Sequence, residues 1–130
     1  MTLKYLITGA TGGLGGRILD YFVANVPLSE FAVSSSQIGN RPVFESRGVQ
    51  FRHLDYEDSA TLEVGLCDVQ NLLFASTNTN VIHIDRITRH HWNVVSAAVK
   101  ANVRHVWYTS LHFGGVGNGS NVAVQQQHII

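Results

Sequence analysis

Five glycines lie close together near the start of the chain, in the stretch LITGATGGLGG of residues 6–16. Gly9, Gly12 and Gly15 have the spacing G-x-x-G-x-x-G, between a strand-like apolar run and a helix-like one. Backbone N–H groups at the start of a helix can bind an anion when no side chain blocks their approach. The spacing and its context predict a cradle for the pyrophosphate of a dinucleotide, with a purely structural turn as the alternative.

Hydroxyl side chains and one cation follow the second strand-like run. Ser34, Ser35 and Ser36 stand at its end, and Arg41 lies within reach on the loop that follows. A carboxylate at this place would bind the 2′-hydroxyl of NAD(H) and repel a 2′-phosphate, whereas an arginine accommodates the phosphate. The residues therefore favour NADP(H) over NAD(H). If the serines only form a polar turn and Arg41 is solvated, the choice between the two cofactors stays open.

The elements that must position these residues follow from the period of the apolar pattern. The pattern predicts strands at residues 4–8, 31–35, 49–54, 71–76 and 103–110, and helices at 14–26, 42–47, 61–66 and 84–98. Asn102 is the expected stop of the last helix. Strands that alternate with helices predict an α/β fold, a Rossmann-like three-layer sandwich with a parallel sheet of order 3-2-1-4-5. We expect one NAD(P)-binding domain over residues 1–130.

Ligands of such a sheet bind beyond the carboxyl ends of the strands, where the strand order reverses between strands 1 and 4. The turns that follow Thr8, Ser35, Leu54, Ser76 and Ser110 are therefore expected to meet at one edge of the sheet. This places the glycine cluster and the serines in one candidate site.

Several stretches together resemble the NmrA-like group of atypical short-chain dehydrogenase/reductases. They are TGATGGLG, the residues Asp55-Tyr56-Glu57-Asp58, the helix end NVVSAAVKANV and the strand VRHVWYTSL. The group includes quinone and imine reductases, NAD(P)H-dependent enzymes of fungal secondary metabolism, and regulators that bind the dinucleotide without turning it over. The resemblance implies that Asp55 and Tyr56 border the adenine and that Ser76 and Thr77 lie along the ribose and nicotinamide path. It also implies a set of pyrophosphate-binding residues: Gly9, Thr11, Gly12, Gly13, Leu14 and Gly15.

Catalytic residues are harder to find in this sequence. Standard short-chain dehydrogenases use Tyr-x-x-x-Lys, and none of the four tyrosines has a lysine four residues later. The NmrA-like group often lacks this dyad, because hydride transfer from a well-placed nicotinamide mainly requires orientation. Ser110, at the end of the fifth strand, and His128 are the candidate catalytic residues. The alternatives are that Ser110 only ends a strand and that His128 only lies on a helix face.

These motifs leave two functions open. The first is an NAD(P)H-dependent oxidoreductase, or its cofactor-binding half, that passes a hydride to a small carbonyl, quinone or imine. The second is a non-catalytic, NmrA-type regulator that senses the dinucleotide and acts through a protein partner.

Composition narrows the remaining classes of protein. Nine Lys and Arg balance nine Asp and Glu, so the chain lacks the basic excess that nucleic-acid binding requires. No apolar run is long enough to span a bilayer. The seven histidines have no zinc-ligand spacing, and the adjacent His90 and His91 suit one surface and one core position. The single cysteine, Cys67, excludes an internal disulfide and favours the cytoplasm.

The chain is also short for the group it resembles. We expect that it is truncated before the substrate-binding lobe, because NmrA-like proteins continue to more than twice this length. On this expectation the outer edge of strand 5 lacks its usual neighbour, which favours a homo-oligomer formed through that edge.

Overall fold

The computed structural model describes residues 2–75 and 84–109, with side chains except those of residues 84–88. Within these ranges a five-stranded parallel sheet has the order β3-β2-β1-β4-β5, as the sequence predicted. The strands are β1 (Leu3–Ile7), β2 (Phe31–Ser35), β3 (Gln50–His53), β4 (Val69–Phe74) and β5 (His105–Tyr108). The helices are α1 (Gly13–Asn25), α2 (Arg41–Glu45), α3 (Ser59–Leu66) and α4 (Ile84–Lys100). Two short 3-10 turns, η1 (Leu28–Glu30) and η2 (Ile38–Asn40), were not predicted.

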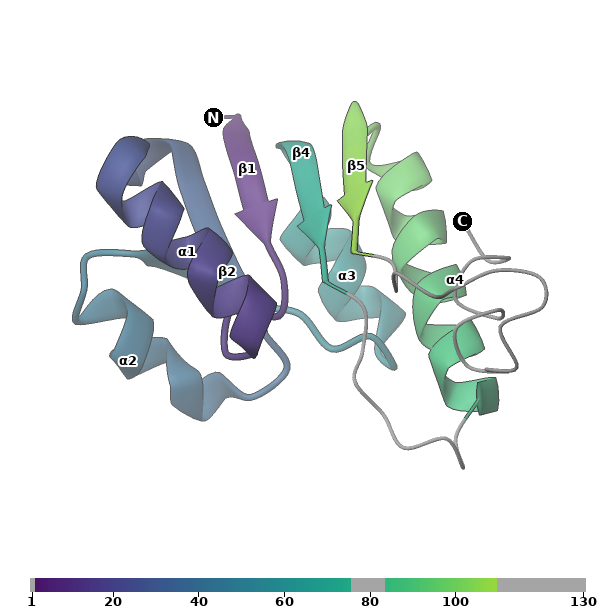
Figure 1. Ribbon diagram of the computed structural model, residues 1–130. Coiled ribbons are helices and arrows are strands. Elements are labelled where there is room, and N and C mark those ends of the chain that lie inside the picture. The colour runs from purple at the N-terminus through teal and green to yellow at the C-terminus, as the bar shows by residue number, and fades with distance from the viewer. Residues whose placement is uncertain (1, 76–83, 110–130) are drawn as a thin grey trace, which may run out of the picture.

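Helices cover the sheet on both faces, which makes three layers. Figure 1 shows α1 in front of β1 and β2, and α3 behind β4. Successive side chains of a strand point to opposite faces of the sheet, so a central strand contributes to the core on both sides. Leu6 pairs with Leu72, and Ile7 pairs with Leu73. Leu6 and Leu72 belong to the cluster that α3 and α4 cover, whereas Ile7 belongs to the cluster under α1 and α2.

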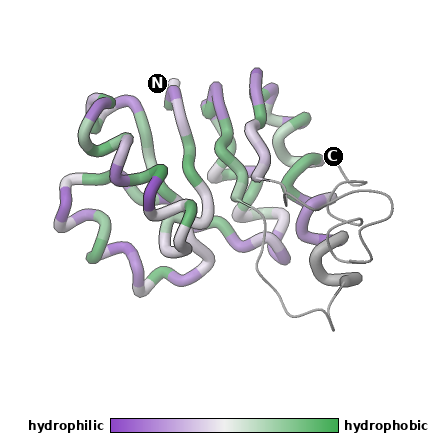
Figure 2. Tube along the Cα trace, viewed as in Figure 1, coloured by the Kyte–Doolittle hydropathy of each residue, from purple (hydrophilic) through white to green (hydrophobic). Residues whose placement is uncertain are grey.

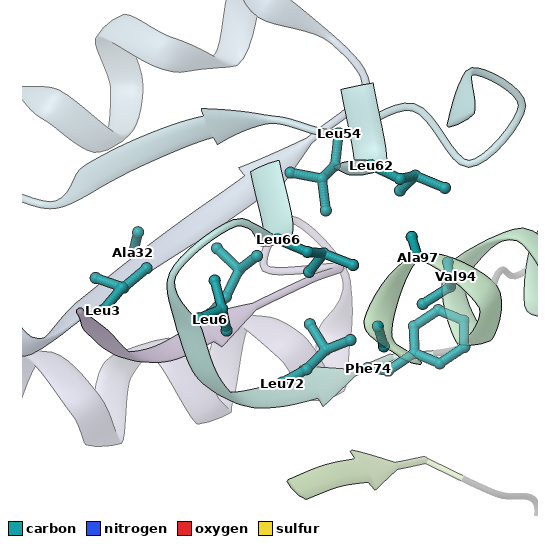
Figure 3. Packing of buried hydrophobic residues seen from close by; sticks show 12 residues of the cluster. Leu3, Leu6, Ala32, Leu54, Leu62, Leu66, Leu72, Phe74, Val94 and Ala97 are labelled. Carbon is teal, nitrogen blue, oxygen red and sulfur yellow. The ribbon is translucent and has the colours of Figure 1, made fainter. Parts of the chain in front are cut away.

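The larger cluster fills the space between the sheet and the pair α3 and α4. Figure 3 shows Leu62 and Leu66 of α3 turned toward the sheet, and Val94 and Ala97 of α4 beside Phe74. The carboxyl half of β4 is hydrophobic in Figure 2, as expected of a central strand covered on both faces. This packing fixes the carboxyl ends of the strands relative to one another.

Helix ends are set by local chemistry. Asn102, with φ of 56°, ends α4 in the left-handed conformation, and the amide of Val103 donates to the carbonyl of Ala98 at 3.0 Å. These are the features of a Schellman motif, so the predicted stop is confirmed. At the start of α3 the Asp58 carboxylate accepts from the amide of Ala60 at 3.1 Å, which is an N-cap that begins the helix two residues before the predicted range.

Some boundaries differ from the prediction. β4 covers Val69–Phe74 and β5 covers His105–Tyr108, whereas the apolar runs predicted 71–76 and 103–110. β4 begins two residues before its predicted range because Val69 already pairs with Leu3 of β1, a long-range contact that the apolar run does not reveal. No helix in the described part of the chain has the length and the apolar character that crossing a bilayer requires.

Candidate functional site

A cleft of about 650 Å³ opens at the carboxyl ends of the strands. Residues that follow all five strands contribute to it, as the fold class requires of a ligand site. Its lining comprises Gly9, Thr11, Gly12, Gly13, Leu14, Gly15, Ser34, Ser35, Ser36, Leu54, Asp55, Tyr56, Glu57, Ala75, His90 and Thr109.

The glycine loop at one side of this cleft has no room for a side chain at two of its positions. Gly9 has φ of +66°, and a Cβ there would lie 2.7 Å from the Cβ of Ala75. A Cβ on Gly15 would overlap the carbonyl oxygen of Gly9. The glycines at positions 9 and 15 therefore let β1, the loop and α1 pack at backbone contact, and so place the start of α1 against the cleft.

The start of α1 has no side-chain cap. Its N-cap is Gly12, no side chain accepts from the first amides, and the first turn contains no acidic residue. The first N–H groups of a helix need a partner and carry a partial positive charge. Gly13, Leu14 and Gly15 form this turn and line the cleft, so the loop offers backbone donors to an anion there.

Thr8, buried directly before the glycine loop, connects elements that border the cleft. Its hydroxyl accepts from the amide of Ala75 at 3.0 Å and lies 3.4 Å from the carbonyl of Leu73. It also forms a side-chain hydrogen bond with Tyr56, whose pKa burial raises to about 12. Tyr56 is therefore a neutral phenol. Thr8 thus joins the ends of β1 and β4 to the loop after β3.

The opposite wall of the cleft is the loop after β3, which residues of α4 contact. The side-chain amide of Asn93 donates from Nδ2 to the carbonyl of Tyr56 at 2.8 Å, and Nε2 of His90 lies 3.2 Å from Oε1 of Glu57. The ring of His90 packs edge-on against that of Tyr56 at 5.7 Å between centroids. Within the loop the carboxylate of Asp55 accepts from the amide of Glu57 at 2.9 Å. These contacts give the wall a defined shape without a ligand.

The serines at the end of β2 already form hydrogen bonds within the protein. The buried hydroxyl of Ser34 donates to the carbonyl of Ile7 at 3.4 Å and ties β2 to β1. The hydroxyl of Ser35 accepts from the amide of Gln37 at 3.1 Å and from the side chain of Asn40 at 3.0 Å. Both serines line the cleft, where Ser36 lies beside them.

Arg41 lies elsewhere. Its guanidinium stacks 5.0 Å from the ring centre of Phe51 and lies 3.4 Å from the carboxylate of Glu45. It lines a separate hollow beside β3 together with Arg52 and Val64, and this hollow shares no lining residue with the cleft. The structure therefore does not bring Arg41 together with the other residues proposed for the cofactor.

The structure brings most of the other predicted residues together. The cleft gathers Gly9, Thr11, Gly12, Gly13, Leu14, Gly15, Ser34, Ser35, Asp55 and Tyr56. Four further predicted residues, Ser76, Thr77, Ser110 and His128, lie outside the described residues.

Three contributors were missed by the sequence reasoning. From the sequence alone, Thr8 is only the end of a strand, Glu57 only part of a motif, and His90 only one of two adjacent histidines. The threonine at the end of the first apolar run, directly before Gly9, was the one signal that the sequence offered.

The adjacent histidines differ from the expectation of one surface and one core position. His90 and His91 are both buried, since His90 turns toward the loop after β3 and His91 packs between Phe74 and Tyr108. Two effects lower the pKa of His91: burial, which is the larger, and electrostatic repulsion from His90. No group of three or more His, Cys, Asp or Glu among the described residues could hold a metal ion.

Proteins that are similar to this chain in sequence are named as oxidoreductases. The chain is 64% identical over 127 residues to the NmrA-like family domain-containing oxidoreductase flvB of Aspergillus flavus. The aligned region covers 98% of this chain and 41% of that protein. It is 32% identical over 105 residues to Quinone oxidoreductase 2 of Escherichia coli, covering 81% of this chain and 35% of the relative. No protein-family model matches the chain.

Solved structures agree with this relationship. Triphenylmethane reductase of Citrobacter sp. complexed with NADP(H) superposes with a TM-score of 0.85 at 29% identity, over 98% of this chain and 45% of that one. The NADPH-dependent quinone oxidoreductase QOR2 of Escherichia coli complexed with NADPH gives 0.80 at 28% identity, over 96% and 44%. The chain thus spans less than half the length of these proteins, and its resemblance to the NmrA-like group is confirmed.

Proposed function

We propose that this NmrA-like chain binds NADP(H) in the cleft and forms the cofactor-binding half of an NAD(P)H-dependent oxidoreductase. The observation that carries the proposal is the uncapped start of α1, which faces the cleft across a loop with no room for side chains at Gly9 and Gly15. The complexes of triphenylmethane reductase and QOR2 with NADP(H) and NADPH support this choice of cofactor.

The residues present fit a dinucleotide. The loop from Gly9 to Gly15 would bind the pyrophosphate through backbone N–H groups, and Asp55 with Tyr56 would border the adenine. Ser34 and Ser35 would line the path of the adenosine ribose, and Ser76 with Thr77 would lie along the ribose and nicotinamide path. When bound, the cofactor supplies a hydride to a small carbonyl, quinone or imine. Ser110 and His128 remain our proposed contacts to the substrate.

Binding is tested by titrating the chain with NADPH and with NADH and following cofactor fluorescence. We expect saturable binding of NADPH at micromolar concentrations. An absence of saturation up to millimolar NADPH would refute the proposal. Gly15→Ala, which disturbs the loop itself, should weaken binding of both cofactors.

Catalysis requires a separate test, because the chain lacks the Tyr-x-x-x-Lys dyad. That absence also suits a non-catalytic regulator that senses the dinucleotide and acts through a protein partner. Oxidation of NADPH should be followed by absorbance with panels of quinones, imines and carbonyl compounds, using the protein as it occurs in cells. Substrate-dependent oxidation supports the reductase, and tight NADPH binding without turnover supports the sensor.

Two further proposals concern the state of the chain in the cell. β5 lies at the edge of the described sheet and exposes Val106 and Trp107, which supports self-association through this strand. Sedimentation that shows only monomer at high micromolar concentration would refute it. The exposed, unpaired thiol of Cys67 supports a reducing compartment such as the cytoplasm, which localisation of a tagged protein would test.

A further inference from the structure

The cleft lacks a cation for the 2′-phosphate that distinguishes NADP(H) from NAD(H). Its described lining contains no lysine or arginine, and two carboxylates, Asp55 and Glu57, contribute to it. A phosphate monoester carries more than one negative charge near neutral pH, so its binding among carboxylates needs a compensating positive charge. Hydroxyls such as those of Ser34 and Ser35 cannot supply that charge.

Only a few cations of the chain are available for this role. Residues 76–83 and 110–130 contain no lysine or arginine, so every candidate lies in the rest of the sequence. Six of the nine form ion pairs: Lys4 with Glu30, Arg41 with Glu45, Arg47 with Asp20, Arg52 with Asp68, Arg89 with Glu57 and Lys100 with Glu63. Among the described residues Arg17 makes no ion pair. Arg104 precedes β5 at the amino ends of the strands, and Arg86 belongs to α4, on the face of the sheet opposite α1.

Arg17 lies beside the glycine loop. It lines a hollow of about 470 Å³ between α1 and α2, and two residues of this hollow, Thr11 and Gly13, also line the cleft. The hollow and the cleft thus adjoin at the loop. Arg17 follows Gly13 by four residues on α1, and side chains of a helix lean toward its N-terminus, so that of Arg17 covers the turn that contains Gly13.

A second arginine reaches the same hollow from the other side. Arg47, just after α2, lies 3.3 Å from the carboxylate of Asp20, which neutralises part of its charge. Arg41 faces away from this region, because its guanidinium is stacked on Phe51 and paired with Glu45 in the hollow beside β3. Of the two arginines that line this hollow, Arg17 is the one without an ion pair among the described residues, and it lies on α1 rather than after β2.

We propose that Arg17 is the residue that selects NADP(H), by pairing with the 2′-phosphate at the side of the glycine loop where the cleft adjoins the α1–α2 hollow. This inference rests on the proposed binding of the dinucleotide in the cleft. It replaces Arg41 in the role that the sequence suggested. Asp20 leaves Arg17 free for the ligand because it pairs with Arg47 instead.

The test compares Arg17→Ala with Arg41→Ala in the 130-residue chain. Each variant is titrated with NADPH and NADH, and with adenosine 2′,5′-bisphosphate and AMP, which differ only in the 2′-phosphate. We expect Arg17→Ala to lose at least about tenfold in affinity for NADPH and for the bisphosphate, as expected of a charge-assisted hydrogen bond, with NADH and AMP unchanged. Arg17→Lys should restore part of the preference, and Arg41→Ala should leave it intact.

Three outcomes would overturn the inference. They are an unchanged ratio of NADPH to NADH affinity in Arg17→Ala, a loss of the ratio in Arg41→Ala, and a wild-type chain that binds both cofactors equally. In each of these cases the chain still binds a dinucleotide, so the proposed function survives. A chain that binds neither cofactor refutes the proposed function and this inference with it. Both arginines are exposed on helices, and far-UV circular dichroism verifies that each variant is folded.

Discussion

Replacement of Gly15 by alanine tests whether backbone contact builds the glycine loop. A Cβ at this position would overlap the carbonyl oxygen of Gly9 and lie 2.6 Å from its carbonyl carbon and 3.1 Å from the amide nitrogen of Ala10. All three atoms belong to the backbone, so no side chain can turn aside. The loop or the start of α1 must move to admit a methyl group.

The expected size of the effect combines two opposing contributions. Overpacking of a tightly packed site costs about 1–3 kcal/mol, and a backbone obstacle places Gly15→Ala at the upper end. Alanine in a helix is favoured over glycine by about 1 kcal/mol, which offsets part of this cost. We therefore expect Gly15→Ala to lower the free energy of unfolding by about 2 kcal/mol.

Gly13→Ala is the matched control. Gly13 lies in the same first turn of α1, and a Cβ there would meet nothing within 4 Å. It keeps the gain in helix propensity without the clash, so the variant should unfold at the same or a slightly higher urea concentration than the wild type. Urea titration monitored by circular dichroism measures both variants. Equal stabilities of Gly15→Ala and Gly13→Ala would refute the argument that close backbone packing requires the glycine.

Further predictions concern the buried polar groups near the cleft. His91→Leu should raise the free energy of unfolding by about 1–3 kcal/mol, because neither ring nitrogen has a hydrogen-bond partner among the described residues. Because burial lowers the pKa of His91 below 6.5, the unfolded chain takes up a proton at this residue before the folded chain does as the pH falls below 6.5, which lowers the free energy of unfolding in acid. His91→Leu removes this proton uptake, so urea titrations of the variant should show a weaker loss of stability in acid. The pKa of Tyr56, about 12, predicts a tyrosinate absorbance step near that pH that Tyr56→Phe abolishes, and a wild-type stability that declines above pH 10 as the unfolded chain ionises first. Thr8→Val should cost about 2 kcal/mol in urea unfolding, since the amide of Ala75 loses its acceptor; an unchanged midpoint would contradict this.

The order of elements, the parallel sheet and the place of the glycine loop could all be predicted from the amino-acid sequence. These depend on patterns local to the chain: the apolar period distinguishes strand from helix, and Gly9, Gly12 and Gly15 stand where strand meets helix. Asn102 likewise ended α4 as its position suggested. The glycine loop and the end of α4 follow from sequence because the contacts that enforce them join residues a few positions apart.

The set of side chains that share the cleft could not be predicted in full and emerged from the folded structure. Arg41 is near Ser35 in the sequence but turns to Phe51, whereas Arg17 lies beside the loop because of its position on α1. Thr8 and Tyr56 meet across strands that are far apart in the chain. The surroundings of each side chain depend on how its helix packs on the sheet and on contacts between strands that are distant in the chain, and no local pattern of residues encodes these contacts.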